Sequence, residues 1–173
     1  DAVPDVVVGA PGDSDTGIGR PGRIYAFSGG TGGLIREYAA ADEDGLSEVG
    51  AALAVLPDLD EDDVPDLLAG APNTGGGDLD GVGHGVLLSG SDSSTIATIP
   101  PPTAVEDGQF GRTLQGLPDV NGDGTPDFAV TAQAWIGGNA GGDGAVYLFS
   151  GADRSLIAEY APPNGETGSS FGA

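Results

Sequence analysis

The chain has 173 residues, including 33 glycines and 13 prolines, and 38% of it is hydrophobic. This composition predicts one compact region of short elements and many turns, without long helices. The five positive residues, all arginine, stand against 27 acidic ones and leave a net charge of -22, which disfavours nucleic acid and anionic membranes as partners because phosphate binding depends on Lys and Arg.

The first part of the chain reads as short apolar runs between turn signals. "DAVPDVVVGAP" (1–11), "GRIYAFSG" (22–29) and "LIREY" (34–38) are each bounded by Gly, Pro, Asp or Ser. Such runs predict short β-strands. No apolar run approaches the ~18 to 20 residues of a membrane span, so we expect no membrane insertion.

The same runs return twice at a constant offset of 61 residues. The second set is "DDVPDLLAGAP" (62–72), "GHGVLLSG" (83–90) and "TIATI" (95–99), and the third is "DGTPDFAVTAQ" (123–133), "GAVYLFSG" (144–151) and "LIAEY" (156–160). The short motifs "VGA" (49–51), "FGR" (110–112) and "FGA" (171–173) keep the same register. A register that persists through loops as well as strands indicates a repeat architecture.

Each unit predicts four strands, which in the third unit are the segments 110–117, 127–132, 144–151 and 155–161. A four-stranded antiparallel sheet repeated at a fixed period is typical of a β-propeller blade. A β-sandwich is the alternative, but its strands need not repeat. We therefore predict an all-β fold of propeller blades, about three in this chain, within a larger ring. Small residues such as Gly70 and Ala129 suggest that the second strand lies near a crowded axis.

The predicted repeat units are 1–48, which lacks the first strand, 49–109 and 110–170, with 171–173 starting a further blade. Asp1 aligns with Asp62 and Asp123, so the sequence begins inside an acidic loop. We expect residues 1–173 to form a single partial propeller from a longer array. Self-association of three-repeat protomers into a complete ring is the alternative.

Acidic side chains crowd the loop before the second strand of each unit. Calcium takes six to eight oxygen ligands at about 2.3 to 2.6 Å, and alternate positions of a tight loop can point inward together. The predicted ligands are Asp58, Asp60, Asp62, the Val64 carbonyl and Asp66 in one site; Asp119, Asn121, Asp123, the Thr125 carbonyl and Asp127 in a second; and Asp1 and Asp5 as the remnant of a third.

Two other interpretations of these loops fit the sequence less well. An EF-hand needs a bidentate Glu at position 12 of the loop, where Ala69 and Val130 stand. Asp and Asn also favour solvated turns without a metal, but two complete copies at matched spacing favour a cation. Position 6 is Gly124 in one loop and Asp63 in the other, and we expect a left-handed backbone there. The ion is expected to stabilise the fold.

Two further residues invite a functional interpretation. His84 is the only histidine, and its repeat equivalents Arg23 and Ala145 indicate an ordinary strand start. Trp135 lies in the loop between the second and third strands, where it either anchors a sugar or partner or folds back on its own blade. With one histidine and no nucleophile elbow, we expect no enzymatic activity from this chain.

The pattern "FGxxLxxLPDxNxDGxPDxxVxA" followed by "GxVYLFSG" resembles the FG-GAP repeat, the blade unit of the integrin α-subunit propeller and of many secreted bacterial proteins. "GAP" stands at 9–11 and 70–72, whereas the third unit has "TAQ" (131–133) and the second opens with "VGA". The resemblance implies a propeller, usually of about seven blades, with calcium in the loop joining the first two strands of some blades.

The resemblance also implies a role. The chain is expected to be a calcium-stabilised, extracellular or cell-surface module for adhesion, protein interaction or surface assembly. A protein or glycan partner would bind at the loops between the second and third strands. A carbohydrate-binding propeller anchored by Trp135 is one alternative. Another is the non-catalytic part of a larger secreted hydrolase, because FG-GAP repeats accompany hydrolase domains.

Overall fold

The computed structural model describes residues 3–14, 19–38, 47–74, 81–133, 144–163 and 171–172. Eleven strands and no helix lie in these ranges. The strands are β1 (Val6–Ala10), β2 (Arg23–Phe27), β3 (Leu34–Tyr38), β4 (Ala52–Val55), β5 (Leu67–Ala71), β6 (His84–Leu88), β7 (Thr95–Ile99), β8 (Leu114–Gly116), β9 (Phe128–Ala132), β10 (Ala145–Phe149) and β11 (Leu156–Tyr160).

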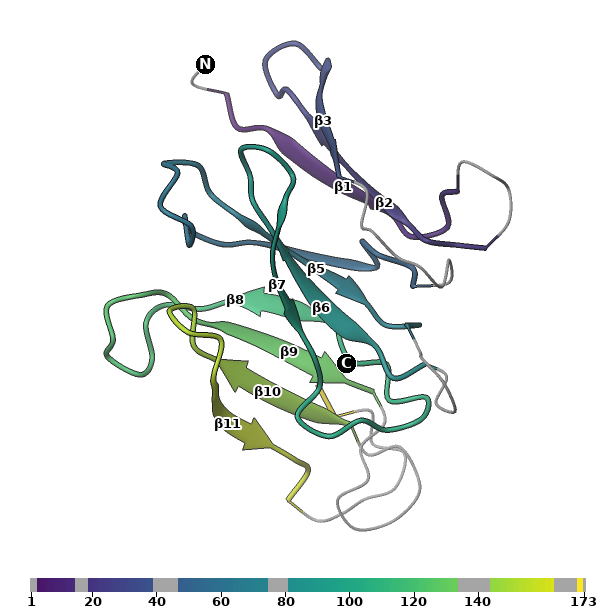
Figure 1. Ribbon diagram of the computed structural model, residues 1–173, viewed down its shortest axis with the longest axis vertical. Coiled ribbons are helices and arrows are strands. Elements are labelled where there is room, and N and C mark those ends of the chain that lie inside the picture. The colour runs from purple at the N-terminus through teal and green to yellow at the C-terminus, as the bar shows by residue number, and fades with distance from the viewer. Residues whose placement is uncertain are drawn as a thin grey trace.

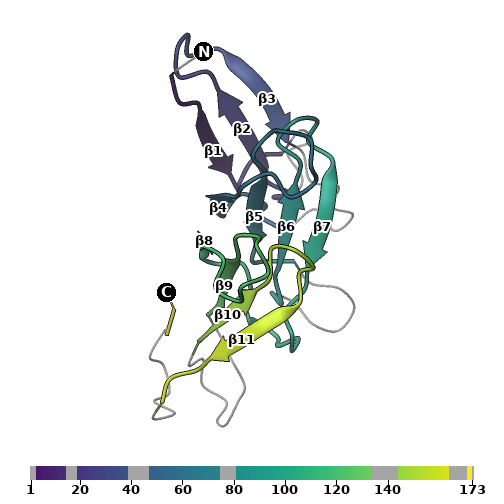
Figure 2. The ribbon, with the colours of Figure 1, turned by 90° about the vertical axis from the view of Figure 1, so that its left-hand side faces the viewer.

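The strands form three antiparallel sheets in which chain neighbours pair with each other. Their orders are β1-β2-β3, β4-β5-β6-β7 and β8-β9-β10-β11. The sheets follow one another along the molecule, with the first at one end and the third at the other (Figures 1 and 2). The fold class is therefore confirmed: the protein is all-β and is built of propeller-type blades. The exact limits of the repeat units stay a prediction.

The 61-residue repeat is visible in the fine geometry of the sheets. A register shift occurs in the equivalent pairs β2-β3, β6-β7 and β10-β11, which are the third and fourth strands of each repeat unit. It falls at Ala26/Phe27, Leu87/Leu88 and Leu148/Phe149. Gly22, Gly83 and Gly144 precede the third strand with positive φ angles of 81, 78 and 76°. Repeated sequence thus produces repeated backbone conformation in turns as well as strands.

The strand after this glycine is apolar on both faces, as its sequence predicts. In β6, Leu87 belongs to the core between the second and third sheets, whereas Val86 and Leu88 belong to the core between the first and second. All three are at most 5% exposed. One strand therefore contributes to two successive interfaces, which explains its uninterrupted apolar sequence.

Each repeat opens by attaching to the sheet before it. Phe110 forms a parallel bridge with Gly83, and the Phe110 N–H donates to the Val82 carbonyl at 3.0 Å. Val49 and Gly22 form the equivalent bridge one repeat earlier. The predicted first strand over 110–117 is therefore too long: β8 begins at Leu114 because Phe110 is held by the preceding sheet.

The small residues of the second strand lie inside their sheets and next to the following repeat. β5 and β9 are second in their sheets, and the expectation that they lie near a crowded propeller axis stays a prediction. Gly70 makes room for the next repeat, because a Cβ on Gly70 would lie 1.9 Å from the Gly111 carbonyl oxygen.

The outward faces of the first and third sheets differ from their equivalents inside the stack. Val6 and Val8 of β1 are 53% and 44% exposed, while their counterparts Leu67 and Ala69 are buried against the first sheet. On the third sheet, Tyr160 is 53% exposed, whereas its counterpart Ile99 is 2% exposed. Within the described residues, two blade faces thus lack the neighbour that the inner faces have.

Candidate metal centre

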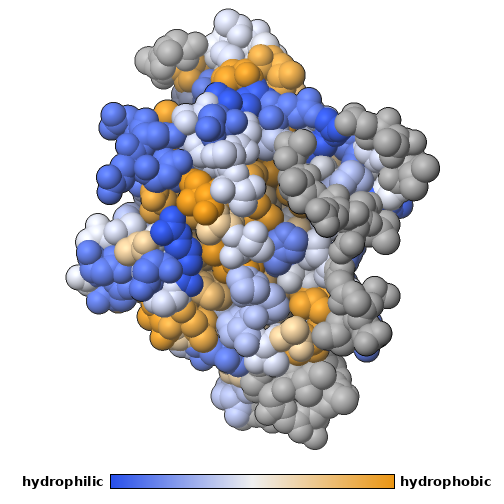
Figure 3. Space-filling model, in the orientation of Figure 1, coloured by the Kyte–Doolittle hydropathy of each residue, from blue (hydrophilic) through white to orange (hydrophobic). Residues whose placement is uncertain are grey.

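The two complete acidic loops connect the first and second strands of the second and third sheets. Leu56 and Asp66 exchange two backbone hydrogen bonds at the base of one loop, at 2.8 and 3.1 Å, and the Leu117 N–H donates to the Asp127 carbonyl at the base of the other. Both loops project at the left-hand edge of the molecule, where hydrophilic residues gather (Figures 1 and 3). The sequence places its acidic residues in hairpin loops with fixed ends.

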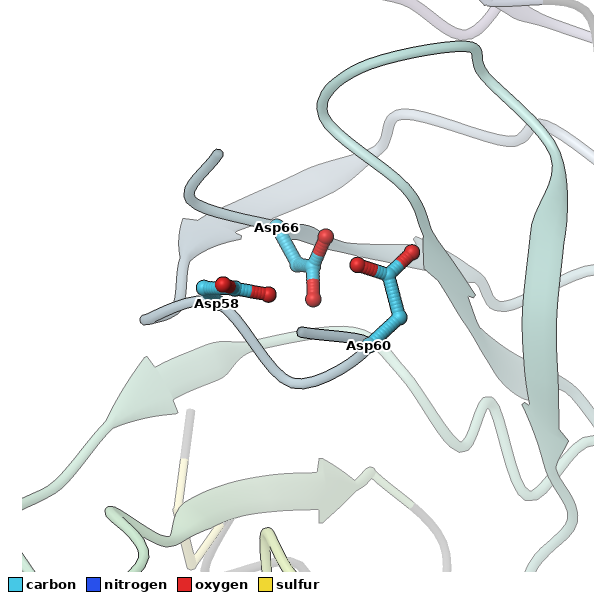
Figure 4. Close-up of side chains that lie close together, drawn as sticks. All are labelled: Asp58, Asp60 and Asp66. Carbon is cyan, nitrogen blue, oxygen red and sulfur yellow. The ribbon is translucent and has the colours of Figure 1, made fainter. Parts of the chain in front are cut away.

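Three side chains of the first complete loop converge. Asp58, Asp60 and Asp66 each offer an oxygen, and these oxygens lie within 4.8 Å of one another. Asp58 and Asp60 come from the loop and Asp66 from the start of the next strand, and the carboxylates lie close together (Figure 4). Asp66 is 1% exposed, Asp58 is half-buried and Asp60 is exposed. Exposure to solvent thus differs from one member of the group to the next.

The carboxylate at position 9 of each loop is fixed by backbone donors. Asp66 accepts from the Leu59 N–H at 2.7 Å with one oxygen and from the Gly90 N–H at 3.2 Å with the other. Asp127, which is fully buried, accepts equivalent bonds from Val120 and Gly151 at 2.7 and 3.1 Å. Each oxygen retains a lone pair for a cation, so this residue can join strand, loop and ion.

The pKa values of Asp58, Asp60 and Asp66 reflect burial, mutual repulsion and backbone hydrogen bonds. Burial, followed by the charges of Asp66 and Asp62, raises the pKa of Asp60. Burial likewise raises the pKa of Asp66. Burial also opposes ionisation of Asp58, but the backbone N–H groups of Asp63 and Asp62 outweigh it and hold the pKa of Asp58 below its usual value. A cation at this point would relieve the repulsion on Asp60 and Asp66.

Asp62, at position 5, lies outside the group of three. Its carboxylate accepts from the Val64 N–H at 2.8 Å and from the Ser89 hydroxyl at 3.1 Å. The Ser91 hydroxyl is the main cause that keeps the pKa of Asp62 below its usual value. Ligation by Asp62 and by the Val64 carbonyl stays a prediction.

The second complete loop, 119–127, has the same backbone but a looser arrangement of side chains. Asp119 accepts from the Gly122 and Gly124 N–H groups at 2.6 and 2.9 Å. The Asn121 amide donates to Asp123 at 2.7 Å, and this bond is the main cause that lowers the pKa of Asp123. Within the described residues, these aspartates form no second group of three as close as the first. The ligand set of this loop, including the Thr125 carbonyl, stays a prediction.

The two loops differ in exposure because of their neighbours. Leu59 packs against the core between the second and third sheets, whereas its counterpart Val120 is 47% exposed. Asp119, Asn121 and Asp123 are all exposed, while Asp58 and Asp62 are half-buried. The third sheet thus shields the first complete loop.

The loops also differ in backbone strain. Positions 4 and 6 have positive φ angles in both loops: 85 and 93° at Gly122 and Gly124, and 66 and 67° at Glu61 and Asp63. The left-handed backbone expected at position 6 is present, and a second one occurs at position 4. Glycine adopts this conformation readily, but residues with a Cβ do so at a cost.

The donor set fits calcium. Both loops present carboxylate, amide and backbone oxygens, which are the ligands of a hard cation, and neither contains a His or Cys ligand suited to zinc or copper. The group of three negative charges around a partly enclosed point suits a divalent ion. In the 119–127 loop, the Asn121 amide would have to turn its oxygen toward the ion.

Other predicted residues fall outside this geometry. Asp5, of the incomplete first loop, accepts from the Gly29 N–H at 3.1 Å, as its equivalents do in the other sheets. Asp1 and Trp135 lie outside the described residues. His84 Nδ1 lies 2.7 Å from the Thr74 hydroxyl, a local contact at the start of β6. Sequence reasoning missed the contacts of Ser89 and Ser150, although "SG" recurs at 28–29, 89–90 and 150–151.

Stacked antiparallel sheets with a 61-residue repeat, of which the second and third carry an acidic loop between their first two strands, define a repeat protein built of β-propeller blades. Residues 110–149 match the family model described as FG-GAP repeat. These residues therefore carry an FG-GAP repeat, which confirms the resemblance that the sequence pattern indicates.

Comparison with known proteins gives relatives of two kinds. The chain is 34% identical over 167 residues to phosphatidylinositol-glycan-specific phospholipase D of Bos taurus, covering 90% of this chain and 20% of that protein. It is 29% identical over 172 residues to integrin alpha-4 of Xenopus laevis, covering 91% of this chain and 14% of that protein. Integrin alpha-7 of Homo sapiens is 31% identical over 143 residues, covering 78% of this chain and 11% of that protein. The chain spans about a fifth or less of each relative's length.

Proposed function

We propose that the chain is a calcium-stabilised β-propeller module that acts outside the cell in adhesion, protein interaction or surface assembly, without catalytic activity of its own. The convergence of Asp58, Asp60 and Asp66 within 4.8 Å carries the calcium part of the proposal. Three carboxylates held this close in a chain with a net charge of -22 are unfavourable unless a cation or protons neutralise them.

The ion would act on stability. Residues 56–66 join β4 to β5, and Asp66 already links this loop to the turn after β6 through Gly90. A cation bound by Asp58, Asp60 and Asp66 would tie the loop to the same point. The 119–127 loop would hold a second ion with Asp119, Asn121, Asp123 and Asp127. Each ion would stabilise the folded state by mass action, because the unfolded loop offers no preformed site.

The proposed setting and partners rest on the family. The integrin relatives support a module that works at the cell surface through protein partners. Such partners would bind at the loops between the second and third strands, most of whose residues lie outside the described ranges. In the described part of the chain there is no helix with the length and apolar character needed to cross a bilayer.

The open faces of the first and third sheets support a further element of the proposal. Val6, Val8 and Tyr160 occupy positions that neighbouring blades bury elsewhere in the stack. We propose that further blades, or a second copy of the chain, cover these faces to continue the ring. Sedimentation velocity over a range of concentrations checks self-association: growth in mass with concentration supports it, and a constant monomer contradicts it.

The phospholipase relative favours one alternative. The match covers 90% of this chain but only 20% of the bovine phospholipase, so the chain could form a non-catalytic part of a larger secreted hydrolase. Calcium-stabilised blades would serve that protein equally well. This alternative changes the kind of longer protein to which the chain would belong, but it does not change the proposed calcium sites.

Thermal unfolding with calcium and with excess chelator tests the proposal. At a free calcium concentration 100 times Kd, one site adds about 2.7 kcal/mol, which raises the melting temperature by roughly 5 to 10 °C in a chain of this size. Asp123→Ala alone should reproduce much of the loss caused by chelation. A melting temperature that chelator leaves unchanged, in protein free of co-purified metal, would show that these loops are ordinary turns.

A further inference from the structure

A Ser-Gly pair follows β2, β6 and β10, the third strand of each repeat unit, and contacts the acidic loop of the same unit. The pairs are 28–29, 89–90 and 150–151. The N–H groups of Gly29, Gly90 and Gly151 donate to the carboxylate at position 9 of the loop at 3.1, 3.2 and 3.1 Å. The same contact at 61-residue intervals indicates a built feature of the repeat.

The glycine of each pair lies directly against the loop backbone. A Cβ on Gly90 would lie 2.0 Å from the Pro65 carbonyl oxygen, and one on Gly151 would lie 1.9 Å from the Pro126 carbonyl oxygen. Any larger residue would push the turn and the loop apart. The close approach therefore holds the neighbouring serine at a fixed distance from the loop.

The serine has one proton to donate, and the structure directs it to the loop. The Ser150 oxygen accepts from the Ala152 and Asp153 N–H groups at 3.1 and 3.4 Å. Its hydroxyl then donates to Asp123 Oδ2 at 3.0 Å. Backbone donors use the acceptor sites of this side chain, which is 2% exposed, so its proton is left for a carboxylate. Asp123 accepts it at 3.0 Å, and the Asp153 carboxylate, whose pKa the same hydroxyl helps to lower, also lies within its reach.

The second sheet repeats the contact between the serine and the loop. The Ser89 oxygen accepts from the Ser91 N–H at 3.2 Å, and its hydroxyl donates to Asp62 Oδ2 at 3.1 Å. The Ser91 hydroxyl, 3.2 Å from the Ser89 oxygen, joins this group in the second sheet. Ser89 is 1% exposed. The other carboxylate oxygen accepts from the backbone N–H two residues on, at 2.8 Å from Val64 in this loop and at 2.8 Å from Thr125 in the other. Both oxygens of the position 5 carboxylate are thus oriented.

We propose that Ser89 and Ser150 are positioning residues for the calcium loops, fixing the carboxylates of Asp62 and Asp123 before the ion arrives; the inference rests on the proposed calcium function. A carboxylate already fixed in orientation loses less freedom when it binds the ion. Hydrogen bonds of this kind to metal ligands are worth about 10- to 100-fold in metal affinity. The turn after the third strand is therefore part of the metal centre, although it contributes no proposed ligand.

Calorimetric titration of the metal-free chain with calcium chloride tests the inference. A background of Asp58→Asn with Asp60→Asn leaves only the 119–127 loop to bind. In it, Ser150→Ala should raise Kd about 10-fold. The matched control is Ser155→Ala, an exposed serine of the same turn that bonds to Asp153 and not to the loop; its Kd should stay within about twofold of the background.

A double-mutant cycle separates positioning from a general effect on folding. If the hydroxyl acts through Asp123, Ser150→Ala should add no further loss of affinity in an Asp123→Asn background. Ser150→Thr keeps the hydroxyl and should bind more tightly than Ser150→Ala. Full additivity, equal affinity of the Thr and Ala variants, or equal losses from Ser150→Ala and Ser155→Ala would overturn the inference. If the background itself bound no calcium, the proposed function of this loop would fail as well.

Discussion

Gly70 and Gly111 lie in direct backbone contact across two successive repeats: a Cβ on Gly70 would stand 1.9 Å from the Gly111 carbonyl oxygen. Gly111 in turn donates its N–H to the Thr131 carbonyl of its own sheet at 2.9 Å. One repeat earlier, Gly9 and Gly50 make the same contact, at 2.0 Å. The glycine of "GAP" and the glycine of the following "FG" are thus two halves of one blade-to-blade contact.

This contact predicts that Gly70→Ala destabilises the fold. The added methyl group must displace the backbone of the next repeat, an overpacking strain worth about 3 kcal/mol. Gly12→Ala is the matched control, because a Cβ there has nothing within 4 Å; its effect should stay within about 0.5 kcal/mol. Urea unfolding measures both. Equal stabilities of the two variants would refute the contact.

The phenylalanine beside Gly111 supports a second prediction. Phe110 is fully buried, and its ring lies 5.6 Å from Tyr147 and 6.1 Å from Phe149, centre to centre. Phe110→Ala should cost about 4 kcal/mol. Phe110→Val should cost less, because Val49 occupies the equivalent site one repeat earlier. Denaturant midpoints of the two variants measure both losses of stability. A loss as large for Phe110→Val as for Phe110→Ala would contradict the equivalence of Phe110 and Val49.

The strained backbone of the first complete loop gives a third prediction. Glu61 and Asp63 have φ angles of 66 and 67°, where the other loop has glycine. Glu61→Gly should stabilise the metal-free chain by about 0.5 to 1 kcal/mol, and Asp63→Gly by less, since Asp tolerates this conformation better. The reverse change, Gly122→Glu, should destabilise it. Unfolding in excess chelator tests all three, and a loss of stability in Glu61→Gly would show that its side chain, rather than its backbone, matters.

Acidification should release calcium from the two loops in sequence. Burial and neighbouring charge raise the pKa of Asp60, and burial raises that of Asp66, whereas the Asn121 amide lowers the pKa of Asp123. A ligand with a raised pKa keeps its proton to a higher pH, and calcium must displace that proton. As pH falls, the loop with Asp58, Asp60 and Asp66 should therefore lose affinity first.

Two variants isolate the loops for this measurement. Asp119→Asn leaves the 58–66 loop, and Asp60→Asn leaves the 119–127 loop. Titration with calcium from neutral pH to about pH 4 then compares the two affinities. The same pH dependence in both variants, or an earlier loss from the 119–127 loop, would contradict the assignment.

Much of the fold could be predicted from the sequence because its signals are local and repeated. Uninterrupted apolar runs between turn residues mark strands such as β6 and β10, and the 61-residue period sets how many sheets they form. The length of β8 could not be predicted in this way. Phe110 pairs with Gly83 in the preceding sheet. The pattern of apolar residues within one repeat does not show such a contact between repeats.

The residues of the candidate site could be predicted from the sequence, but the differences between its two loops could not. The 61-residue spacing of Asp58 and Asp119 places the two loops in equivalent hairpins, yet within the described residues only the first loop brings three carboxylates together. Leu59 is half-buried against the core between the second and third sheets, and Val120 is exposed. This asymmetry depends on which sheets are neighbours in space, so the loop sequences alone do not contain it.

The most direct test of the central claim is calorimetric titration of the metal-free chain with calcium. The structure predicts saturable binding that Asp60→Asn together with Asp123→Ala abolishes, with magnesium a poor competitor because it demands a smaller, more regular site. Absence of calcium binding to metal-free, folded protein, or binding that survives both substitutions, would contradict the assignment of these acidic loops as its calcium centres.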